Sequence, residues 1–415
     1  MTSSRDEARC TGRGVPPGRG PYDVGCGDVM TDIVEPGILL RLFYPIDRTD
    51  QGIPLEVRPP WLPSDHYAEG YANVGGVKCL GSQVKSLLEN IKLPVWWHGK
   101  LSESKTKYPV IIFSHGMGGC RTTYTSICMD IASCGCVVAA VEHRDNSGCH
   151  SFFLKNTTDD KPMATNGDQQ LLQPTYQAVD FIKAPYEDPD LRLRQITQRR
   201  DECIASLNFL EVLDDGLNYE SDIDKDFDLA EFKGRLDLSS AAMCGHSYGG
   251  ATAIATLSKE KRFKCGVACD PWGYTLSLDE SFRCVDQPML IINTEKFQFK
   301  DNMEHLLCLM PDTEATSGSR QMITIRGTDH QCQTDMGFVF PYFLAKLLNM
   351  RDKLHPRVAI ETNNDAMINF LSQYISLERG AGMMEFNAMS NPLIMIGHNV
   401  NMNPSPWWKR RADKK

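Results

Sequence analysis

The sequence predicts an α/β fold in which a mostly parallel central sheet is flanked by helices. Two observations support this prediction. First, the order of the motifs between residues 108 and 330 describes one continuous sheet. Second, this region contains short apolar runs that are typical of buried strands, each followed by polar residues. These runs are 108–113, 137–141, 263–269, 288–293 and 321–325.

The stretch Gly245-His246-Ser247-Tyr248-Gly249-Gly250 refines the fold class. It follows an apolar run and precedes a helix of small residues at 251–257, which is the setting of a nucleophile elbow. In that turn a strained serine is exposed between strand and helix, and the glycines leave room where β-carbons would clash. The five residues from Gly245 to Gly249 alone would also fit an ordinary Gly/Ser turn. The strand and helix around them favour the α/β-hydrolase fold with Ser247 as nucleophile.

A serine nucleophile needs a base and an acid that orients the base, and in this fold both follow it along the chain. Asp270 ends the predicted strand 263–269, and His330 lies in the loop after the strand 321–325. Imidazole titrates near neutral pH, so His330 can accept the serine proton and return it to the leaving group. Asp270 would then hold the ring in the required tautomer.

Other carboxylates remain candidates for the acid. Asp329 adjoins His330, but side chains of adjacent residues rarely point at one another, so we favour Asp270. Asp286 and Asp279 are weaker candidates because neither ends a clear strand.

The run Ser114-His115-Gly116-Met117-Gly118-Gly119 follows the apolar strand 108–113. This is the position of the glycine-rich loop that supplies backbone N–H groups to an oxyanion in α/β-hydrolases. We assign one donor to the N–H of Met117 and the other to the N–H of Tyr248, the residue after the nucleophile. Each donor of this kind contributes about 2.7–4 kcal/mol to the transition state. A plain glycine-rich turn is the alternative for this loop taken by itself.

These residues together identify a resemblance to the platelet-activating factor acetylhydrolases of the plasma and intracellular type II kind. The similar segments cover roughly residues 20–375: Gly20–Cys26, Tyr108–Gly118, Val138–Asp145, Gly245–Ala253, Arg262–Gly266, and Met322–Gly327 leading into His330-Gln331. The resemblance implies a serine-dependent, calcium-independent phospholipase A2. Such an enzyme would cleave the short or oxidised sn-2 acyl ester of phospholipids, taking platelet-activating factor to its lyso form and acetate through an acyl-enzyme.

The resemblance also implies roles for Ser247, Asp270 and His330, with Met117 and Tyr248 as oxyanion donors and no cofactor or metal. Two positions depart from the family pattern. Pro271 follows the acid and stiffens its loop, and Tyr248 replaces a commoner Phe, which is expected to add a hydroxyl to the pocket. A broader carboxylesterase or lipase, and a catalytically silent lipid-binding relative, stay open as alternatives.

Composition limits the remaining possibilities. The chain has 415 residues and a net charge of −9, which argues against non-specific nucleic-acid binding. It contains no apolar stretch near the ~18 residues of a transmembrane helix and no secretory signal, and Thr2 excludes N-myristoylation. We expect one domain over 20–376, a disordered segment at 1–19 and a poorly defined extension at 377–415.

Fifteen cysteines, many of them inside predicted strands and helices, indicate reduced thiols rather than a disulfide framework. We therefore expect a cytoplasmic protein. The resemblance to enzymes of membrane-held lipids adds the expectation of reversible, peripheral association with membranes.

Two charged segments are interpreted as structural. Glu142-His143-Arg144-Asp145 follows the strand 137–141 and is expected to form a buried network behind the active-site loops. Residues 190–214 carry a helical pattern of apolar residues, so a core helix is predicted there. Its charged residues are expected on the solvated side: Arg194, Arg199, Arg200, Asp201 and Glu202.

Residues 82–92 can form an amphipathic helix, with Trp96 and Trp97 shortly after it. The pattern fits a core helix and a lipid interface equally well, and the family's lipid substrates favour the interface. The residues expected to dock are Leu87, Leu88, Ile91, Trp96 and Trp97. The segment Phe338–Leu344 is the next candidate, although it is more typical of the start of a core helix.

Overall fold

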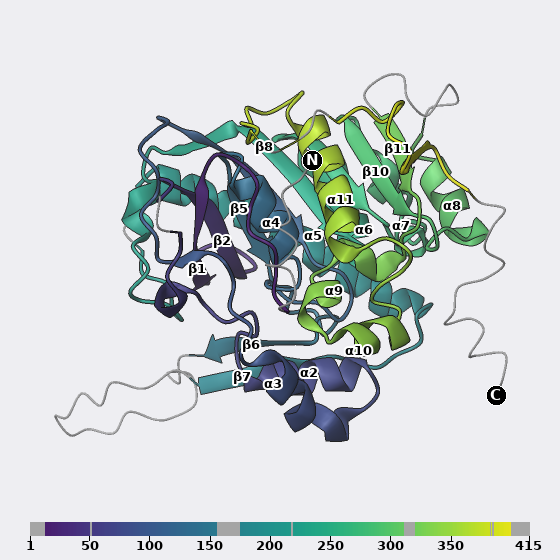
Figure 1. Ribbon diagram of the computed structural model, residues 1–415, viewed down its shortest axis with the longest axis horizontal. Helices are drawn as coiled ribbons and strands as arrows, with labels where there is room; N and C mark the ends of the chain where they lie inside the picture. The colour runs from purple at the N-terminus through teal and green to yellow at the C-terminus, as the bar shows by residue number, and fades with distance from the viewer. Residues whose placement is uncertain are drawn as a thin grey trace, which may run out of the picture.

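A central sheet of ten strands organises the chain (Figure 1). The computed structural model describes residues 13–49, 52–155, 175–216, 219–310, 320–381, 383 and 386–399. Within them the strand order is β12-β11-β10-β9-β8-β4-β5-β2-β1-β3. The strands are β1 Asp23–Thr31, β2 Ile38–Ile46, β3 Trp96–Trp97, β4 Tyr108–Ser114, β5 Val137–Val141, β8 Leu236–His246, β9 Phe263–Cys269, β10 Met289–Thr294, β11 Arg320–Ile325 and β12 Ile394–Ile396.

The middle of the sheet, from β5 through β4, β8, β9 and β10 to β11, is parallel. The registers bring the ends of these strands to one edge: Ser114 lies opposite Gly245, and His246 lies opposite Cys269. Functional loops of α/β sheets collect at the carboxyl ends of parallel strands. The prediction of a mostly parallel sheet is therefore confirmed, and its ends place the segments after β4, β8, β9 and β11 together.

Helices cover both faces of the sheet, and each face has its own apolar core. Alternate residues of β4 point to opposite sides, so Ile111 and Phe113 join one core while Val110 and Ile112 join the other. In Figure 1, α4 and α11 cover the near face and α5 and α6 the far face. The helices are α2 Asp65–Val74, α3 Gly81–Leu88, α4 Thr125–Ala132, α5 Pro189–Asp214, α6 Tyr248–Lys259, α7 Gly273–Leu276, α8 Lys300–Leu307, α9 Met336–Val339, α10 Tyr342–Leu347 and α11 Pro356–Leu371.

A smaller unit lies below the main sheet in Figure 1. It consists of α2, α3 and an antiparallel pair, β6 His150–Lys155 and β7 Thr175–Asp180. A polar contact joins this unit to the sheet. The Tyr67 hydroxyl on α2 donates at 2.6 Å to Glu142, the residue after β5.

Both terminal segments make contacts with the domain where they are described. In the 1–19 segment, Val15 is buried and the Arg19 guanidinium pairs with Asp130 at 2.6 Å and with Asp365 at 2.8 Å. In the 377–415 segment, β12 adds an antiparallel strand beside β11. Residues 1–12 and 400–415 lie outside the described ranges.

Every cysteine among the described residues is a free thiol, and most of these cysteines are buried. None of the helices in the described ranges has both the length and the apolar character that crossing a bilayer requires.

The expected lipid interface at 82–92 is wrong for two of its residues. The helix α3 ends at Leu88. The side chains of Leu88 and Ile91 are 0% and 4% exposed, and both belong to the apolar core that also includes residues of α4 and α11. Leu87 and Trp97 are half-buried against the same core, and Trp96 packs on the other. An amphipathic pattern shows that one face is covered, and here the protein itself covers it.

Truncation of Leu88 should therefore destabilise the fold rather than weaken lipid binding. Leu88→Ala is expected to lower the free energy of unfolding by about 2–5 kcal/mol, because it leaves a cavity in a closed core. Leu87→Ala, at the half-buried neighbouring position, is the matched control and should cost about 1 kcal/mol or less. Chemical denaturation measures both, and equal losses would contradict the burial of Leu88.

Candidate active site

Ser247 occupies a sharp turn between β8 and α6. Its backbone has φ 60° and ψ −120°, a conformation that L-residues rarely adopt. The turn requires glycine on both sides, because a β-carbon at Gly245 would lie 2.1 Å from the Gly249 carbonyl oxygen. A β-carbon at Gly249 would lie 2.0 Å from the carbonyl oxygen of Ser114 on β4. The geometry of a nucleophile elbow thus holds the serine hydroxyl at the strand ends.

The three residues predicted as nucleophile, acid and base lie together. The His330 Nε2 atom is 2.9 Å from Ser247 Oγ, and His330 Nδ1 is 3.0 Å from Asp270 Oδ2. Asp270 also accepts hydrogen bonds from the Thr294 N–H at 2.6 Å and from the Thr294 hydroxyl at 2.5 Å. Thr294, at the end of β10, fixes the carboxylate, and the sequence analysis did not single it out.

The other candidate acids are engaged elsewhere. The Asp329 carboxylate accepts from the backbone N–H of His330 at 2.7 Å, where it caps the 3-10 helix η6, His330–Gln333. Asp279 caps another short helix by accepting from the Ser281 N–H, and Asp286 pairs with Lys261 at the surface. Among these carboxylates, Asp270 is the one that contacts the His330 ring.

Burial shapes the electrostatics of the pair. Desolvation lowers the pKa of His330 below its ordinary value of 6.5, although the nearby Asp329 charge opposes that shift. Desolvation likewise raises the pKa of Asp270 above 3.8, opposed by His246 and by the hydrogen bonds from Thr294. A neutral imidazole beside an ionised carboxylate can accept a proton from serine at neutral pH.

Two aromatic rings pack against the imidazole of His330, one stacked and one tilted. The Phe297 ring lies 3.7 Å from it at an interplanar angle of 18°, and the His246 ring lies 4.4 Å away. His246 Nδ1 is 2.8 Å from the Tyr124 hydroxyl, which accepts from the Gly116 N–H at 3.0 Å. The triad is thereby connected to the glycine-rich loop after β4. Phe297 follows β10. The only sequence signal for its place beside His330 is that aromatic residues follow this predicted strand.

His246, Asp270 and His330 also bring possible metal-ligand atoms within 4.8 Å of one another. The hydrogen bonds that His330 makes to Asp270 and Ser247 favour proton transfer as the use of this cluster.

The N–H groups of three glycines in the loop after β4 have acceptors. Gly116 donates to the Tyr124 hydroxyl at 3.0 Å, Gly118 donates to the Ser147 carbonyl at 2.7 Å, and Gly119 donates to the Gly116 carbonyl at 3.1 Å. The N–H of Tyr248 lies at the first residue of α6, where backbone donors have no acceptor within their own helix. A β-carbon at Gly116 would approach Ser247 Cβ to 3.0 Å, so the loop runs directly over the serine. Tyr248 thus adjoins Ser247 in the chain, and Met117 follows the glycine that approaches Ser247, so the assignment of their N–H groups as oxyanion donors stays a prediction.

The expected hydroxyl of Tyr248 does not enter the pocket. Tyr248 is fully buried, and its hydroxyl donates to the Arg192 carbonyl of α5 at 3.0 Å. The residue points to the side of the sheet that α5 covers.

The network expected behind the site is present and larger than predicted. Glu142, His143, Arg144 and Asp145 are all buried, and His143 bridges Ser114 at 2.7 Å and Glu202 at 2.7 Å. The solvated position expected for Glu202 and Arg199 on the core helix is wrong, because both are buried on its inner side. The partners that hold them include residues of the loops after β4 and β5, which are distant in the sequence.

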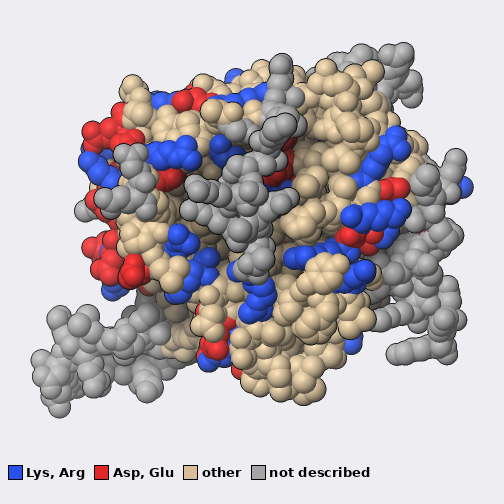
Figure 2. Space-filling model, in the orientation of Figure 1, with Lys and Arg blue, Asp and Glu red and all other residues tan. Residues whose placement is uncertain are grey.

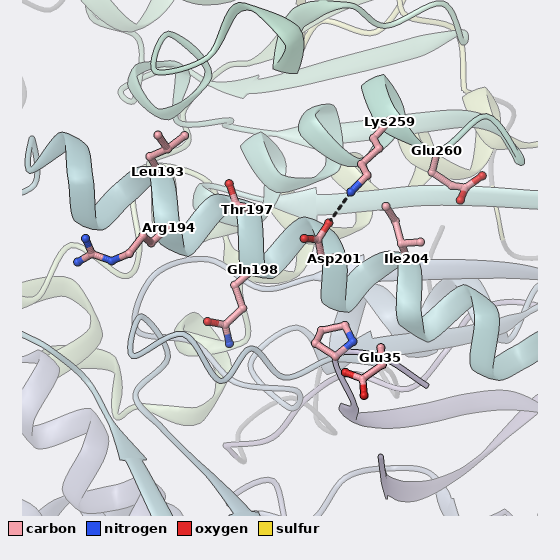
Figure 3. A pocket seen from close by; sticks show the side chains of 10 residues that line it. Glu35, Leu193, Arg194, Thr197, Gln198, Asp201, Ile204, Lys259 and Glu260 are labelled. Carbon is pink, nitrogen blue, oxygen red and sulfur yellow. Dashed lines mark hydrogen bonds and ion pairs between the residues drawn. The ribbon is translucent and has the colours of Figure 1, made fainter. Parts of the chain in front are cut away.

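The outer side of α5 faces a groove of about 910 Å³ (Figure 3). Leu193, Arg194, Thr197 and Asp201 point toward it, as does Lys259 of α6, which pairs with Asp201 at 3.1 Å. No residue of the triad lines this groove. The groove is therefore separate from the chemistry at the strand ends.

Known proteins resemble the chain in sequence and in fold. The family model described as platelet-activating factor acetylhydrolase, isoform II, matches residues 8–390. Platelet-activating factor acetylhydrolase of Cavia porcellus is 34% identical over 88% of this chain and 79% of its own. The protein of that name from Gallus gallus is 34% identical over 94% of this chain and 91% of its own. The solved structure of a ferulic acid esterase from Streptomyces cinnamoneus superposes with a TM-score of 0.56, at 14% identity, over 93% of this chain and 99% of that one.

The pKa shifts predict the acid side of the pH–rate profile. With His330 as the predicted base and Asp270 as its predicted acid, hydrolysis would require neutral His330 beside ionised Asp270, so kcat/KM should be constant above neutral pH and fall as the pair takes up a proton. Because burial lowers the pKa of His330, the apparent pKa of this fall should lie below 6.5. Rates on a soluble ester between pH 4.5 and 9 would measure it, and a fall centred above about 7 would contradict the assignment.

Proposed function

The chain belongs to the platelet-activating factor acetylhydrolase family, and on that premise we propose that it is a serine esterase of phospholipids. Its substrate is the short or oxidised sn-2 acyl ester, so that platelet-activating factor yields its lyso form and acetate. This is the activity of a 1-alkyl-2-acetylglycerophosphocholine esterase. The observation that carries the proposal is the hydrogen-bonded line from Ser247 Oγ through the His330 ring to Asp270.

The first half of the reaction acylates the enzyme. Ser247 Oγ attacks the sn-2 carbonyl carbon while His330 Nε2 accepts the hydroxyl proton. The carbonyl oxygen becomes an oxyanion, to which the N–H groups of Met117 and Tyr248 donate. The tetrahedral adduct collapses, the bond to the glycerol oxygen breaks, and His330 returns the proton to that oxygen. The lysophospholipid leaves and the acyl group remains on Ser247.

The second half regenerates the serine. Water attacks the acyl carbon, His330 accepts a water proton, and the oxyanion forms again beside the same two N–H groups. Collapse releases the short acid, and His330 returns its proton to Ser247 Oγ. Asp270 stays ionised throughout and stabilises the imidazolium that forms twice in each cycle. No step in this sequence uses calcium or another metal.

We expect Ser247→Ala to abolish ester hydrolysis and labelling by an organophosphonate. Loss of the nucleophile removes about six orders of magnitude from kcat in serine hydrolases. Ser258→Ala is the matched control on the same helix, since the Ser258 hydroxyl donates only to the Ala255 carbonyl. Labelling and initial rates on an acetyl ester measure both variants, and a chelator should leave the wild-type rate unchanged.

The same assay separates the proposal from its alternatives. A broader carboxylesterase or lipase would turn over long-chain sn-2 phosphatidylcholines as fast as the acetyl analogue. A silent lipid-binding relative would fold but remain unlabelled. Full activity of Ser247→Ala would refute the serine mechanism itself.

Membrane docking is the second part of the proposal, and the exposed apolar side chains support α10 as its site. Four side chains on or next to this helix are unusually exposed for their size: Tyr342 64%, Phe343 68%, Leu347 75% and Leu348 52%. In Figure 2 the surface in the region of α10 carries few charged residues. The aromatic and aliphatic groups, with the exposed Lys346 among them, have the composition of an interfacial helix.

The position of these residues relative to the triad also supports docking. The chain passes from the His330 helix η6 through α9 directly into α10. On α2, Val74 is 37% exposed, and a β-carbon at Gly118 of the glycine-rich loop would lie 2.7 Å from its Cγ1 atom. Exposed apolar groups thus accompany both the base and the oxyanion loop. Reversible adsorption to the lipid surface would bring a bilayer-held ester to Ser247.

Replacement of Phe343 and Leu347 by Ser should weaken vesicle binding without affecting the chemistry. Burial of such side chains contributes roughly 1.5–3 kcal/mol each, so we expect at least a ~10-fold loss of partition to phosphatidylcholine vesicles. Leu307→Ser on α8, at a 39% exposed position, is the control. Sedimentation with vesicles and rates on a soluble ester separate the effects. An unchanged partition, or equal losses on vesicles and soluble ester, would contradict docking through α10.

A further inference from the structure

The inner side of α5 carries one fully buried arginine that contacts the site from behind. Arg199 is 0% exposed, and its Nε atom donates to Asp145 Oδ2 at 2.8 Å, so its charge is paired. The same guanidinium makes further contacts with two segments on which the proposed oxyanion donors lie. The mechanism above assigns it no task.

The first of these segments is the glycine-rich loop after β4. Arg199 Nη1 donates to the His115 carbonyl at 2.7 Å, which fixes the loop two residues before Met117. Arg199 Nη2 donates to the Ser147 hydroxyl at 2.6 Å, and the Ser147 carbonyl accepts from the Gly118 N–H at 2.7 Å. The guanidinium therefore holds the loop on both sides of Met117, once directly and once through Ser147.

The second segment is the start of α6. The guanidinium carbon of Arg199 lies 4.5 Å from the centre of the Tyr248 ring, in a cation–π contact. The Tyr248 hydroxyl donates to the carbonyl of Arg192, which lies about two turns nearer the start of α5. The side chain of Tyr248 is thus held at its ring and at its hydroxyl, and its backbone N–H is the second oxyanion donor.

We propose that Arg199 is a positioning residue that sets the spacing between the Met117 and Tyr248 N–H groups. The inference rests on the serine mechanism proposed above, because the spacing matters only if an oxyanion forms between these donors. Their contribution depends on reaching the oxyanion at about 2.7–3.1 Å. A displacement of about 1 Å in such a group can lower a rate by 10²-fold.

Arginine suits this task in a way that lysine does not. Its planar fork donates in three directions at once, here to Asp145, His115 and Ser147, while its face remains open to an aromatic ring. A lysine ammonium is a point charge without a planar face. It could keep the pair with Asp145, but it could not hold the loop and the Tyr248 ring together.

The main test compares Arg199→Lys with Arg41→Lys. Arg41 is a close match, since it is 2% exposed, makes two hydrogen bonds to Asp28 and lies 5.2 Å from the Trp97 ring, but contacts neither donor segment. On a soluble acetyl ester, we expect Arg199→Lys to lower kcat by about 30- to 300-fold with KM changed less than about 3-fold. Arg41→Lys should keep kcat within about 3-fold of wild type, even where the two variants lose similar thermal stability.

A second measurement isolates the oxyanion. A trifluoromethyl ketone forms a tetrahedral adduct with the serine, and its affinity should fall in Arg199→Lys by the same factor as kcat/KM. The acid side of the pH–rate profile should stay in place, because the triad is unaltered. If Arg199 had only a structural role, Arg199→Lys would lower the folded fraction. The protein that remains folded would then keep the wild-type kcat, KM and affinity for the ketone.

A milder variant covers the case in which Arg199→Lys does not fold. Ser147→Ala removes the hydroxyl between Arg199 and the loop at little cost in volume, and it should lower kcat by about 5- to 10-fold with KM preserved. An unchanged kcat in folded Arg199→Lys or in Ser147→Ala, or a change in KM alone, would overturn the inference. Retention of activity by Ser247→Ala would overturn the proposed serine mechanism instead, so the two failures are distinguishable.

Discussion

At Ser247 the chain passes from β8 into α6 with φ 60°, and the arrangement of the whole site depends on that turn. A left-handed backbone at a residue with a side chain is costly, so the surroundings must hold it in place. They do so by close packing: Gly245, Gly249 and the end of β4 approach one another so tightly that no β-carbon fits between them. The same contacts bring the glycine-rich loop over the serine. One packing arrangement therefore positions both the proposed nucleophile and the loop proposed to supply an oxyanion donor.

Buried charge is the second feature that shapes the site. Asp145, Arg199 and Glu202 lie behind the strand ends, where isolated charges would be strongly unfavourable. Arg199 of α5 pairs with Asp145 after β5, whereas Glu202 of α5 lies 4.0 Å from the Arg144 guanidinium and forms a hydrogen bond with His143, so these contacts connect segments from different parts of the chain. Breaking one partner of such a pair leaves an uncompensated charge, so these contacts resist rearrangement. The helix α5 thereby serves as a rigid support behind loops that are otherwise rich in glycine.

The sequence was sufficient for the strands, the elbow and the positions of Asp270 and His330, because each depends on local patterns in a fixed chain order. The parallel registers then bring these residues together. It was insufficient for Leu88 and Ile91, since amphipathicity indicates an apolar face but not whether protein or lipid covers it. It also failed for Arg199, because charged residues in helices are usually solvated and its partners, His115 and Asp145, are far away in the chain.

The segment after β11 combines two requirements of the proposed function. Chemistry needs a rigid, desolvated imidazole, and His330 has this environment between Asp270, Phe297 and His246. Contact with an interface needs exposed apolar groups, which α10 carries shortly afterwards in the same stretch of chain. The two do not conflict, because Asp335 between them is fixed in the core by hydrogen bonds from Trp61 and Ser126. If α10 docks on a lipid surface as proposed, the anchored Asp335 separates that contact from the imidazole of His330.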